Sequence, residues 1–319
     1  MKTALVLSGG GARGAYHVGV CKALDDLNFP IDLVCGTSVG ALIAAMIVQG
    51  DVKRLVDIWW NLGAEQVYKQ NSKLKFLFSF QMKYIYPYFS SEPLEKLIVD
   101  NIDPEKIRRS DKKLIVTACN QTLRRLVRFT NTFENLPLAL LASASIPIAY
   151  PPVLMNGFEF VDAGVIDNVP LKPAIEEGAD KIIVVVGSHP TDLPPPIKNN
   201  LEWALWLIDI AHAHNVFADI EMAKKINFSE DREKKGYKLI DLTLMAPPQG
   251  LDLNVTDFHK RNLIRTAIKL GYEDGMRAFN PRLRSGEVGL ENIMKTTFKE
   301  EGGGRDKDIS YYWNESGQV

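Results

Sequence analysis

A serine stands between small residues in segment 36–40, Gly-Thr-Ser-Val-Gly, and its hydroxyl could act as a nucleophile. Glycines beside such a serine allow the sharp strand-to-helix turn, the nucleophile elbow, that exposes the hydroxyl above a sheet. A strand-like apolar run at 31–35 precedes the segment, and an apolar helical pattern at 39–48 follows it. We therefore take Ser38 as the candidate nucleophile, with Gly36 and Gly40 supporting the turn.

A serine hydroxyl needs a base to accept its proton, and two kinds of base are available. Segment 160–164, Phe-Val-Asp-Ala-Gly, places Asp162 after a strand-like run, at the rim of a sheet where sites of open α/β folds gather. Asp before small residues is also ordinary turn chemistry. A triad would instead need a histidine, and none stands in a distinctive motif. The five histidines are His17, His189, His212, His214 and His259.

Segment 9–14, Gly-Gly-Gly-Ala-Arg-Gly, follows a strand-like run and opens a helical pattern. Bare backbone N–H groups at a helix N-terminus stabilise an anion, so the segment could form an oxyanion hole. Its Gly-x-Gly-x-x-Gly spacing also fits a dinucleotide fingerprint, with Asp32 as the ribose-binding acid, or a plain glycine-rich turn. Arg13 in the first helical turn opposes the helix dipole by about 0.3–1 kcal/mol, which suggests a role near an anion.

Together and in this order, the three motifs resemble those of the patatin-like phospholipase family. Blocks at 142–152 and 162–170 extend the similarity, which covers residues 1–187. The resemblance implies a three-layer α/β/α fold with a mostly parallel central sheet. It also implies a Ser-Asp dyad without histidine that acts on phospholipids or related acyl lipids and requires no metal or cofactor.

The resemblance also implies a role for each motif residue. Ser38 is the nucleophile and Asp162 the base. The oxyanion hole and supporting positions are Gly9, Gly10, Gly11, Ala12, Arg13, Gly14 and Gly164. Ala163 stands where the family commonly has glycine, so a positive φ at this position would be strained.

Alternating strand and helix patterns must position these motifs. The order strand, helix, strand, helix over residues 3–48 predicts a parallel sheet covered on both faces. Later strands are expected at 113–117, 127–130, 158–161, 181–187 and, as an outer strand, 237–242. Helices are expected at 51–61, 93–101, 136–144, 171–177, 201–225 and 256–279.

The pattern predicts one domain over 1–281 and a mobile or loosely docked C-terminal tail over 282–319. Aromatic and basic residues interleave at 69–89. This segment is expected to form a lid, a membrane-contact insertion or a cover of the core.

Composition narrows the class of protein. A chain of 319 residues with 46% hydrophobic residues can bury a large core. Lys and Arg number 38 against 39 Asp and Glu, which predicts no broad attraction to nucleic acid. Three scattered cysteines suit buried thiols in the reducing cytoplasm, and polar residues interrupt the first apolar run before it could form a signal peptide.

We therefore expect a phospholipid or other acyl lipid as the partner. The protein is expected to be cytoplasmic, with peripheral contact to the membrane. Two other classes stay open. A noncatalytic lipid-binding protein would keep the fold without turnover. A dinucleotide-binding oxidoreductase would use segment 9–14 but leave Ser38 and Asp162 without a role.

Overall fold

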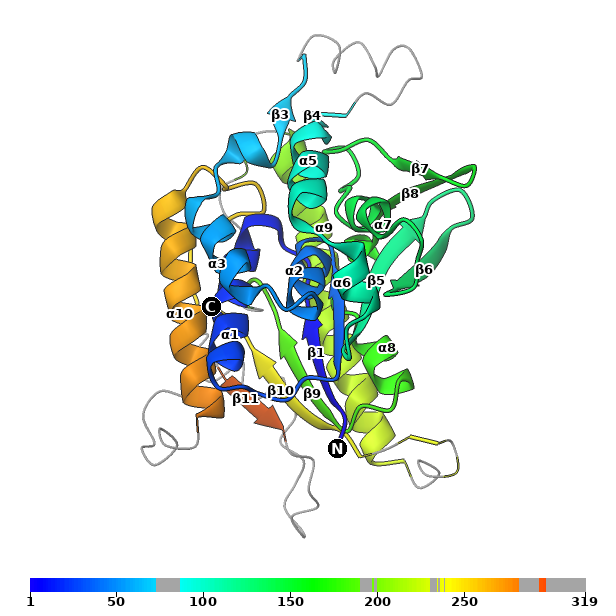
Figure 1. Cartoon of the computed structure of the whole chain (residues 1–319), viewed down its shortest axis with the longest axis vertical. Coiled ribbons are helices and arrows are strands. Elements are labelled where there is room, and N and C mark those ends of the chain that lie inside the picture. The colour runs from blue at the N-terminus through cyan, green and yellow to red at the C-terminus, as the bar shows by residue number, and fades with distance from the viewer. Residues whose placement is uncertain are drawn as a thin grey trace.

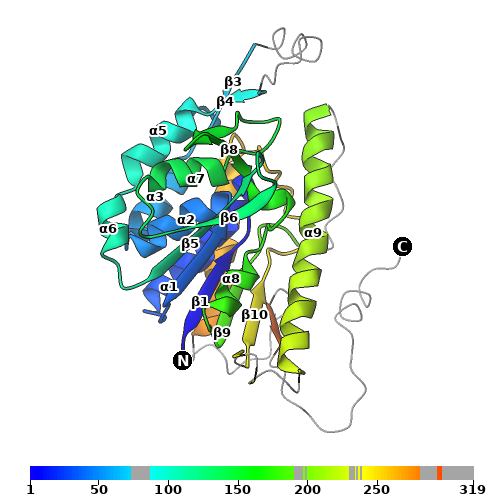
Figure 2. The same ribbon diagram turned by 90° about the vertical axis from the view of Figure 1, so that its right-hand side faces the viewer.

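A central sheet lies between two layers of helices in the computed structural model (Figures 1 and 2). The structure describes residues 1–72, 87–189, 197, 200–229, 234, 236–237, 239–280 and 293–296. The three-layer α/β/α architecture with a mostly parallel sheet is therefore confirmed.

Five parallel strands form the middle of the sheet, in the order β10-β9-β1-β2-β5. They are β1 (Thr3–Leu7), β2 (Leu33–Thr37), β5 (Lys113–Asn120), β9 (Lys181–Val185) and β10 (Asp241–Met245). Antiparallel strands complete its edges: β6 (Arg125–Thr130) and β8 (Phe158–Asp162) pair with β5, β7 (Val153–Met155) with β8, and β11 (Ile293–Thr296) with β10. Apart from this sheet, β3 (Lys69–Gln70) pairs with β4 (Phe89–Ser90).

Both faces of the parallel strands are buried, which is why these strands read as continuous apolar runs. In β1, Leu5 and Leu7 join one core while Ala4 and Val6 join the other. Side chains of a strand point alternately to the two faces, so a single strand serves both cores.

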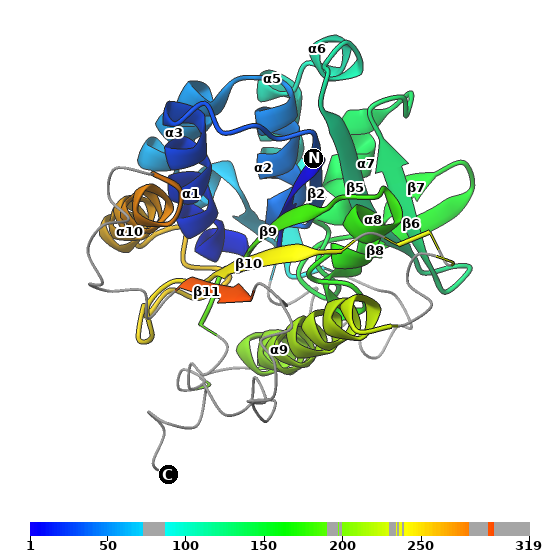
Figure 3. The ribbon, with the colours of Figure 1, turned by 90° about the horizontal axis from the view of Figure 1, so that it is seen from below.

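The larger helical layer covers one face with α1 (Gly14–Asp26), α2 (Val39–Val48), α3 (Val52–Asn61), α5 (Glu92–Asn101), α6 (Pro104–Arg108), α7 (Leu136–Ser143) and α10 (Arg261–Phe279). The opposite face carries α8 (Leu171–Glu176) and the long helix α9 (Asn200–Asn227). In Figure 3, α9 lies on one side of β9 and β10, and α1 and α10 lie on the other side. Three short 3₁₀ helices, η1 (Gly11–Arg13), η2 (Ala64–Gln66) and η3 (Ala163–Val165), lie in connections.

Two expected elements are misplaced in the sequence prediction. The outer strand expected at 237–242 is β10, which begins at Asp241 and lies inside the sheet. The Ile240 N–H donates to Asn227 Oδ1 at 2.8 Å, and the Ile240 carbonyl accepts from Asn227 Nδ2 at 2.9 Å. Ile240 therefore pairs with a side chain and not with a neighbouring strand. The helix expected from residue 256 begins at Arg261, because the Asp257 side chain accepts the Asn254 N–H and holds a turn there.

Two expected segments are described only in part. Residues 73–86 of segment 69–89 lie outside the described residues, and the two ends of that segment form β3 and β4. Of the tail expected at 282–319, the structure describes β11 alone.

Helices α1 and α10 pack with their backbones in close contact. A Cβ on Gly271 would lie 2.1 Å from the Tyr16 carbonyl oxygen, and one on Gly19 would lie 2.0 Å from that of Ile268. The Tyr16 hydroxyl donates a hydrogen bond of 2.8 Å to Asp274 in the same interface. This contact fixes α1, whose first turn follows the glycine segment.

We expect Gly271→Ala to lower the free energy of unfolding by about 2–3 kcal/mol, because the added methyl would push two helix backbones apart. Helix propensity alone predicts a gain of about 1 kcal/mol, so the sign separates the two effects. Urea unfolding would measure the change. Thr266→Ala, on the exposed side of the same helix, is the control. A stabilised Gly271→Ala variant would contradict the close packing.

Candidate active site

Ser38 lies at the sharp turn between β2 and α2, with φ 56° and ψ −130°. Such a conformation is strained for a residue with a side chain and persists where surrounding contacts hold it. The Ser38 N–H donates to Ser143 Oγ at 2.9 Å, and Ser143 Oγ donates to the Thr117 carbonyl at 2.7 Å. Strand β5 and helix α7 therefore hold the elbow in place.

Glycines let α2 approach the sheet at this turn. A Cβ on Gly36 would lie 2.4 Å from the Gly40 carbonyl oxygen, and one on Gly40 would lie 2.3 Å from that of Leu7. No side chain fits at either position, because backbone atoms occupy the space. The two glycines thus permit the close approach of α2 to the ends of β1 and β2.

Asp162 ends β8 and is 5% exposed, like Ser38. Its backbone pairs with Ala118 of β5, and its Oδ1 accepts the Gly164 N–H at 2.7 Å. Ala163 begins η3 with a negative φ, so alanine is unstrained there. The antiparallel pairing of β8 with β5 brings Asp162 to the pocket that Ser38 lines.

Hydrogen bonds within the protein occupy some backbone N–H groups of the glycine segment and leave others available. The N–H of Gly9 donates to the Asn168 carbonyl at 3.1 Å, and that of Ala12 to the Val255 carbonyl at 2.9 Å. The N–H groups of Gly10 and Gly11 have no acceptor among the described residues. Of the four residues expected in the oxyanion hole, these two therefore have N–H groups available for a ligand.

Arg13 connects the glycine segment to α9. Its guanidinium donates two hydrogen bonds to the Asp209 carboxylate, at 2.9 and 2.7 Å, and its Nε donates to the Leu253 carbonyl at 3.0 Å. A planar guanidinium matches a carboxylate in this bidentate geometry. Arg13 is thus engaged in holding the loop. Gly14, one residue later, lets α1 pack against Val39, because a Cβ there would lie 2.8 Å from Val39 Cγ2.

Asp32 lies far from the glycine segment, contrary to what the dinucleotide alternative requires. Its carboxylate accepts the Thr3 N–H at 2.7 Å. Thr3 begins β1, whereas the glycine segment follows the end of β1 at Leu7. With about 3.3 Å per strand residue, the acid lies at the opposite edge of the sheet.

The histidines give Ser38 no partner in the described part of the chain. His17 is fully buried, burial lowers its pKa to about 3, and its Nε2 lies 3.5 Å from Ser8 Oγ. The described side chains of His17, His189 and His259 line neither pocket that contains Ser38. The side chains of His212 and His214 lie outside the described set.

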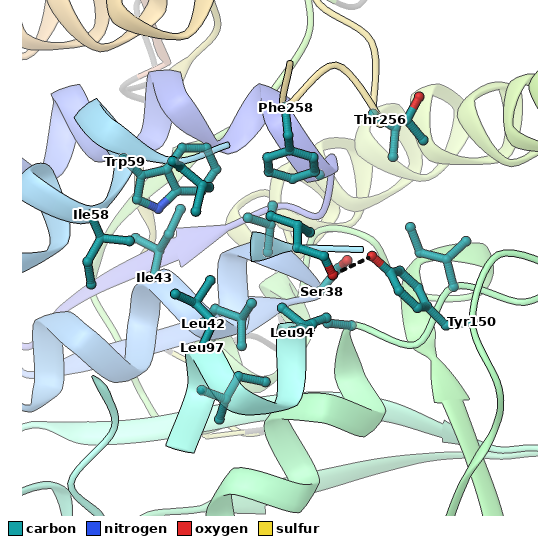
Figure 4. A pocket seen from close by; sticks show the side chains of 18 of the residues that line it. Ser38, Leu42, Ile43, Ile58, Trp59, Leu94, Leu97, Tyr150, Thr256 and Phe258 are labelled. Atoms are coloured by element: carbon teal, nitrogen blue, oxygen red, sulfur yellow. Dashed lines mark hydrogen bonds between the residues drawn. The ribbon is translucent and has the colours of Figure 1, made fainter. Parts of the chain in front are cut away.

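Among the described residues, two pockets meet at Ser38. The larger, of about 960 Å³ with its opening to solvent included, runs between α2, α3 and α5 and has an almost wholly apolar lining (Figure 4). Its wall includes Leu42, Ile43, Met46, Trp59, Leu94, Leu97 and Phe258. The smaller, of about 360 Å³, contains Asp162, Gly9, Gly10 and Asn168. Ser38 thus lies between a larger apolar cavity and a smaller pocket to which Asp162 and the glycine segment contribute.

Sequence reasoning did not single out two neighbours that shape this site, Asp209 and Val255. Each comes from a segment distant from the residue it contacts, so no local pattern marks it. Ser143 and Asn168 lie in the blocks 142–152 and 162–170, which extend the family similarity, but neither had been given a role.

Among the described residues, no cluster of three or more His, Cys, Asp or Glu side chains could hold a metal ion. Within the same residues, no helix has the length and apolar character needed to cross a membrane. Cys21, Cys35 and Cys119 are buried free thiols, as expected.

Comparison with known proteins gives the family. The family model described as patatin-like phospholipase matches residues 5–175. Lysophospholipase NTE1 of Yarrowia lipolytica is 29% identical over 208 residues, which cover 63% of this chain and 14% of that protein. Lysophospholipase NTE1 of Phaeosphaeria nodorum is 27% identical over 311 residues, which cover 93% of this chain and 19% of that protein.

The chain therefore spans less than a fifth of the length of these relatives. Among solved structures, VipD from Legionella pneumophila aligns with a TM-score of 0.48 and 16% identity, over 92% of this chain and 68% of that one. The family model matches more than half of the chain and includes the glycine segment, the elbow and Asp162. This chain belongs to the patatin-like phospholipase family.

Proposed function

We propose that the protein is a serine lipid acyl hydrolase with a Ser38–Asp162 dyad. The observation that carries the proposal is the junction at Ser38, where a pocket with Asp162 and the glycine segment meets an apolar cavity. Family membership and the lysophospholipase names of the relatives support the same chemistry. This arrangement also favours turnover over lipid binding alone, because binding would require neither the strained elbow nor a buried acid.

The proposed reaction is a two-step acyl transfer through Ser38. Ser38 Oγ attacks the ester carbonyl carbon while the Asp162 carboxylate takes its proton. The N–H groups of Gly10 and Gly11 stabilise the oxyanion. The C–O bond then breaks, and the alcohol leaves with the proton from Asp162. Water attacks the acyl-enzyme, again giving its proton to Asp162, and the fatty acid is released as Ser38 regains its hydrogen.

Replacing either member of the dyad tests this mechanism. We expect Ser38→Ala and Asp162→Asn each to lower kcat for p-nitrophenyl butyrate by at least about 10³-fold, because each removes a group that acts in the transition state. Ser38→Ala should also lose labelling by a fluorophosphonate. Asp111→Asn, whose side chain is 91% exposed, is the control. Full labelling or turnover by Ser38→Ala would remove Ser38 as nucleophile.

We infer that the larger cavity holds one acyl chain. Its wall follows α2 from Ser38 to Met46, a length of about 12 Å at 1.5 Å per residue. Each methylene group buried there contributes about 0.8 kcal/mol to binding. The smaller pocket then receives the alcohol side of the ester, because Asp162, which returns the proton to the leaving alcohol, lines it. A monoacyl phospholipid is thus the proposed substrate, in keeping with the names of the relatives.

Filling the cavity should change chain-length preference. Leu97 lines the cavity from α5, and we expect Leu97→Trp to lower kcat/KM for p-nitrophenyl palmitate about tenfold relative to the butyrate ester, because the indole occupies space that a long chain needs. Val99→Trp is the matched control, since Val99 is 61% exposed on the same helix. An unchanged palmitate-to-butyrate ratio in Leu97→Trp would place the acyl chain elsewhere.

We also propose that the outer face of α9 contacts lipid. The protein would do so from the cytoplasm, because the reducing conditions there suit its three buried free thiols. Leu205 and Ile208 of α9 line the smaller pocket. Trp203, Leu207 and Ile210, spaced as one helical stripe, point away from it and are 53%, 48% and 48% exposed. A helix with apolar side chains on two opposite faces is stable when both faces are buried. The protein buries the inner face of α9, and a lipid surface, which contains the substrate, would bury the outer face.

Vesicle binding tests this contact. We expect the triple variant Trp203→Ser, Leu207→Ser and Ile210→Ser to bind phosphatidylcholine vesicles about tenfold more weakly in a sedimentation assay, because it loses the exposed apolar stripe. Leu154→Ser is the control, since Leu154 is 68% exposed on β7. Equal binding of wild type and triple variant would exclude α9 as the contact.

A further inference from the structure

The side-chain amide of Asn168 is a buried polar group in the smaller pocket that the proposed dyad does not use. Asn168 is 4% exposed, and its Oδ1 has no hydrogen-bond partner among the described residues. Buried amides in folded proteins almost always have partners, and the exceptions call for an explanation. Because this amide lines the pocket of Ser38 and Asp162, a bound ligand is the natural partner.

The backbone around Asn168 holds this amide close to the nucleophile. The Asn168 carbonyl accepts the Gly9 N–H at 3.1 Å, and the residues that follow, Val169 and Pro170, are buried. A Cβ built on Gly9 would lie 2.4 Å from Asn168 Oδ1 and 3.1 Å from Ser38 Cβ. Asn168 Oδ1 and Ser38 Cβ therefore lie no more than 5.5 Å apart. A substituent on the carbon next to an ester bound at Ser38 would therefore lie within reach of the Asn168 amide.

The amide lies on the alcohol side of the site. Asn168 lines the smaller pocket and is absent from the lining of the apolar cavity. Four residues with polar side chains line the smaller pocket: Ser38, Asp162, Asn168 and Asp209. Ser38 and Asp162 act on the ester in the proposed reaction, and Asp209 is paired with Arg13. Among these four side chains, that of Asn168 has hydrogen-bonding capacity left for the substrate.

We propose that the Asn168 amide binds the free hydroxyl next to the scissile ester of a monoacyl glycerolipid. This inference rests on the proposed function and assigns a specificity residue to it. An amide offers both an acceptor and a donor, and a hydroxyl can complement either one. A diacyl lipid carries a second ester at that carbon, and this ester has no proton to donate to Asn168 Oδ1. Asn168 therefore selects monoacyl over diacyl substrates.

The test compares 1-palmitoyl-lysophosphatidylcholine with its 2-deoxy analogue, which lacks the hydroxyl alone. We expect wild type to prefer the hydroxyl substrate about tenfold in kcat/KM, equivalent to about 1.4 kcal/mol. In Asn168→Leu, which has a similar shape but no hydrogen-bonding group, the ratio should fall to about one. A purely structural role for Asn168 would lower both values and leave the ratio unchanged, so that result overturns the inference.

Wild type alone provides a second measurement that does not depend on folding of the variant. Equal turnover of the two lipids by wild type overturns the role of Asn168 while leaving the hydrolase proposal intact. Failure of wild type to hydrolyse either lipid or to react with a fluorophosphonate overturns both. Asn61→Leu, an exposed change on α3, should keep the wild-type ratio.

Discussion

The strained backbone of Ser38 is the constraint on which the rest of the site depends. A positive φ at a serine is unfavourable in isolation, so the surrounding contacts must stabilise it. Helix α2 can begin at Val39 because Gly40 brings it against the end of β1, and Ser143 of α7 accepts the Ser38 N–H. Moving any of these three elements would allow the turn to relax and the hydroxyl to leave the pocket.

The same close packing separates the two sides of Ser38. On one side, α2, α3 and α5 contribute apolar side chains, so that space favours a hydrocarbon chain. On the other side lie the ends of β1 and β8, where backbone N–H groups and carboxylates gather. In the proposed reaction, the acyl part of the ester lies in the apolar cavity and its alcohol part lies beside Asp162. The two sides of Ser38 differ because different elements of the fold line them.

Helix α9 joins this site to the surface. Its inner face covers the smaller pocket, and the ion pair between Asp209 and Arg13 ties it to the glycine segment. Arg13 is 11% exposed and also bonds the Leu253 carbonyl, so this connection is largely shielded from solvent. A charged pair in such a setting fixes geometry more than it adds stability. The position of α9 is therefore coupled to the glycine segment, which contains the proposed oxyanion donors Gly10 and Gly11.

The amino-acid sequence by itself determined the features that arise from local constraints. The helix expected at 39–48 has the observed bounds, because a strand, a turn of small residues and an apolar helix follow one another without a gap. Strand β1 and the mostly parallel sheet follow from apolar runs alternating with helical patterns. The motifs of Ser38, Asp162 and the glycine segment follow or end strand-like runs, so the sequence alone marks them as candidate site residues.

Tertiary structure alone decided how these residues are used. Asn168 and Val255 take the N–H groups of Gly9 and Ala12, and this leaves those of Gly10 and Gly11 available. The partner of Arg13, the inward position of β10 and the two pockets at Ser38 likewise come from segments far apart in the chain. Hydrogen-bond partners and cavities depend on which segments pack together, and a local pattern of residue types carries no record of that packing.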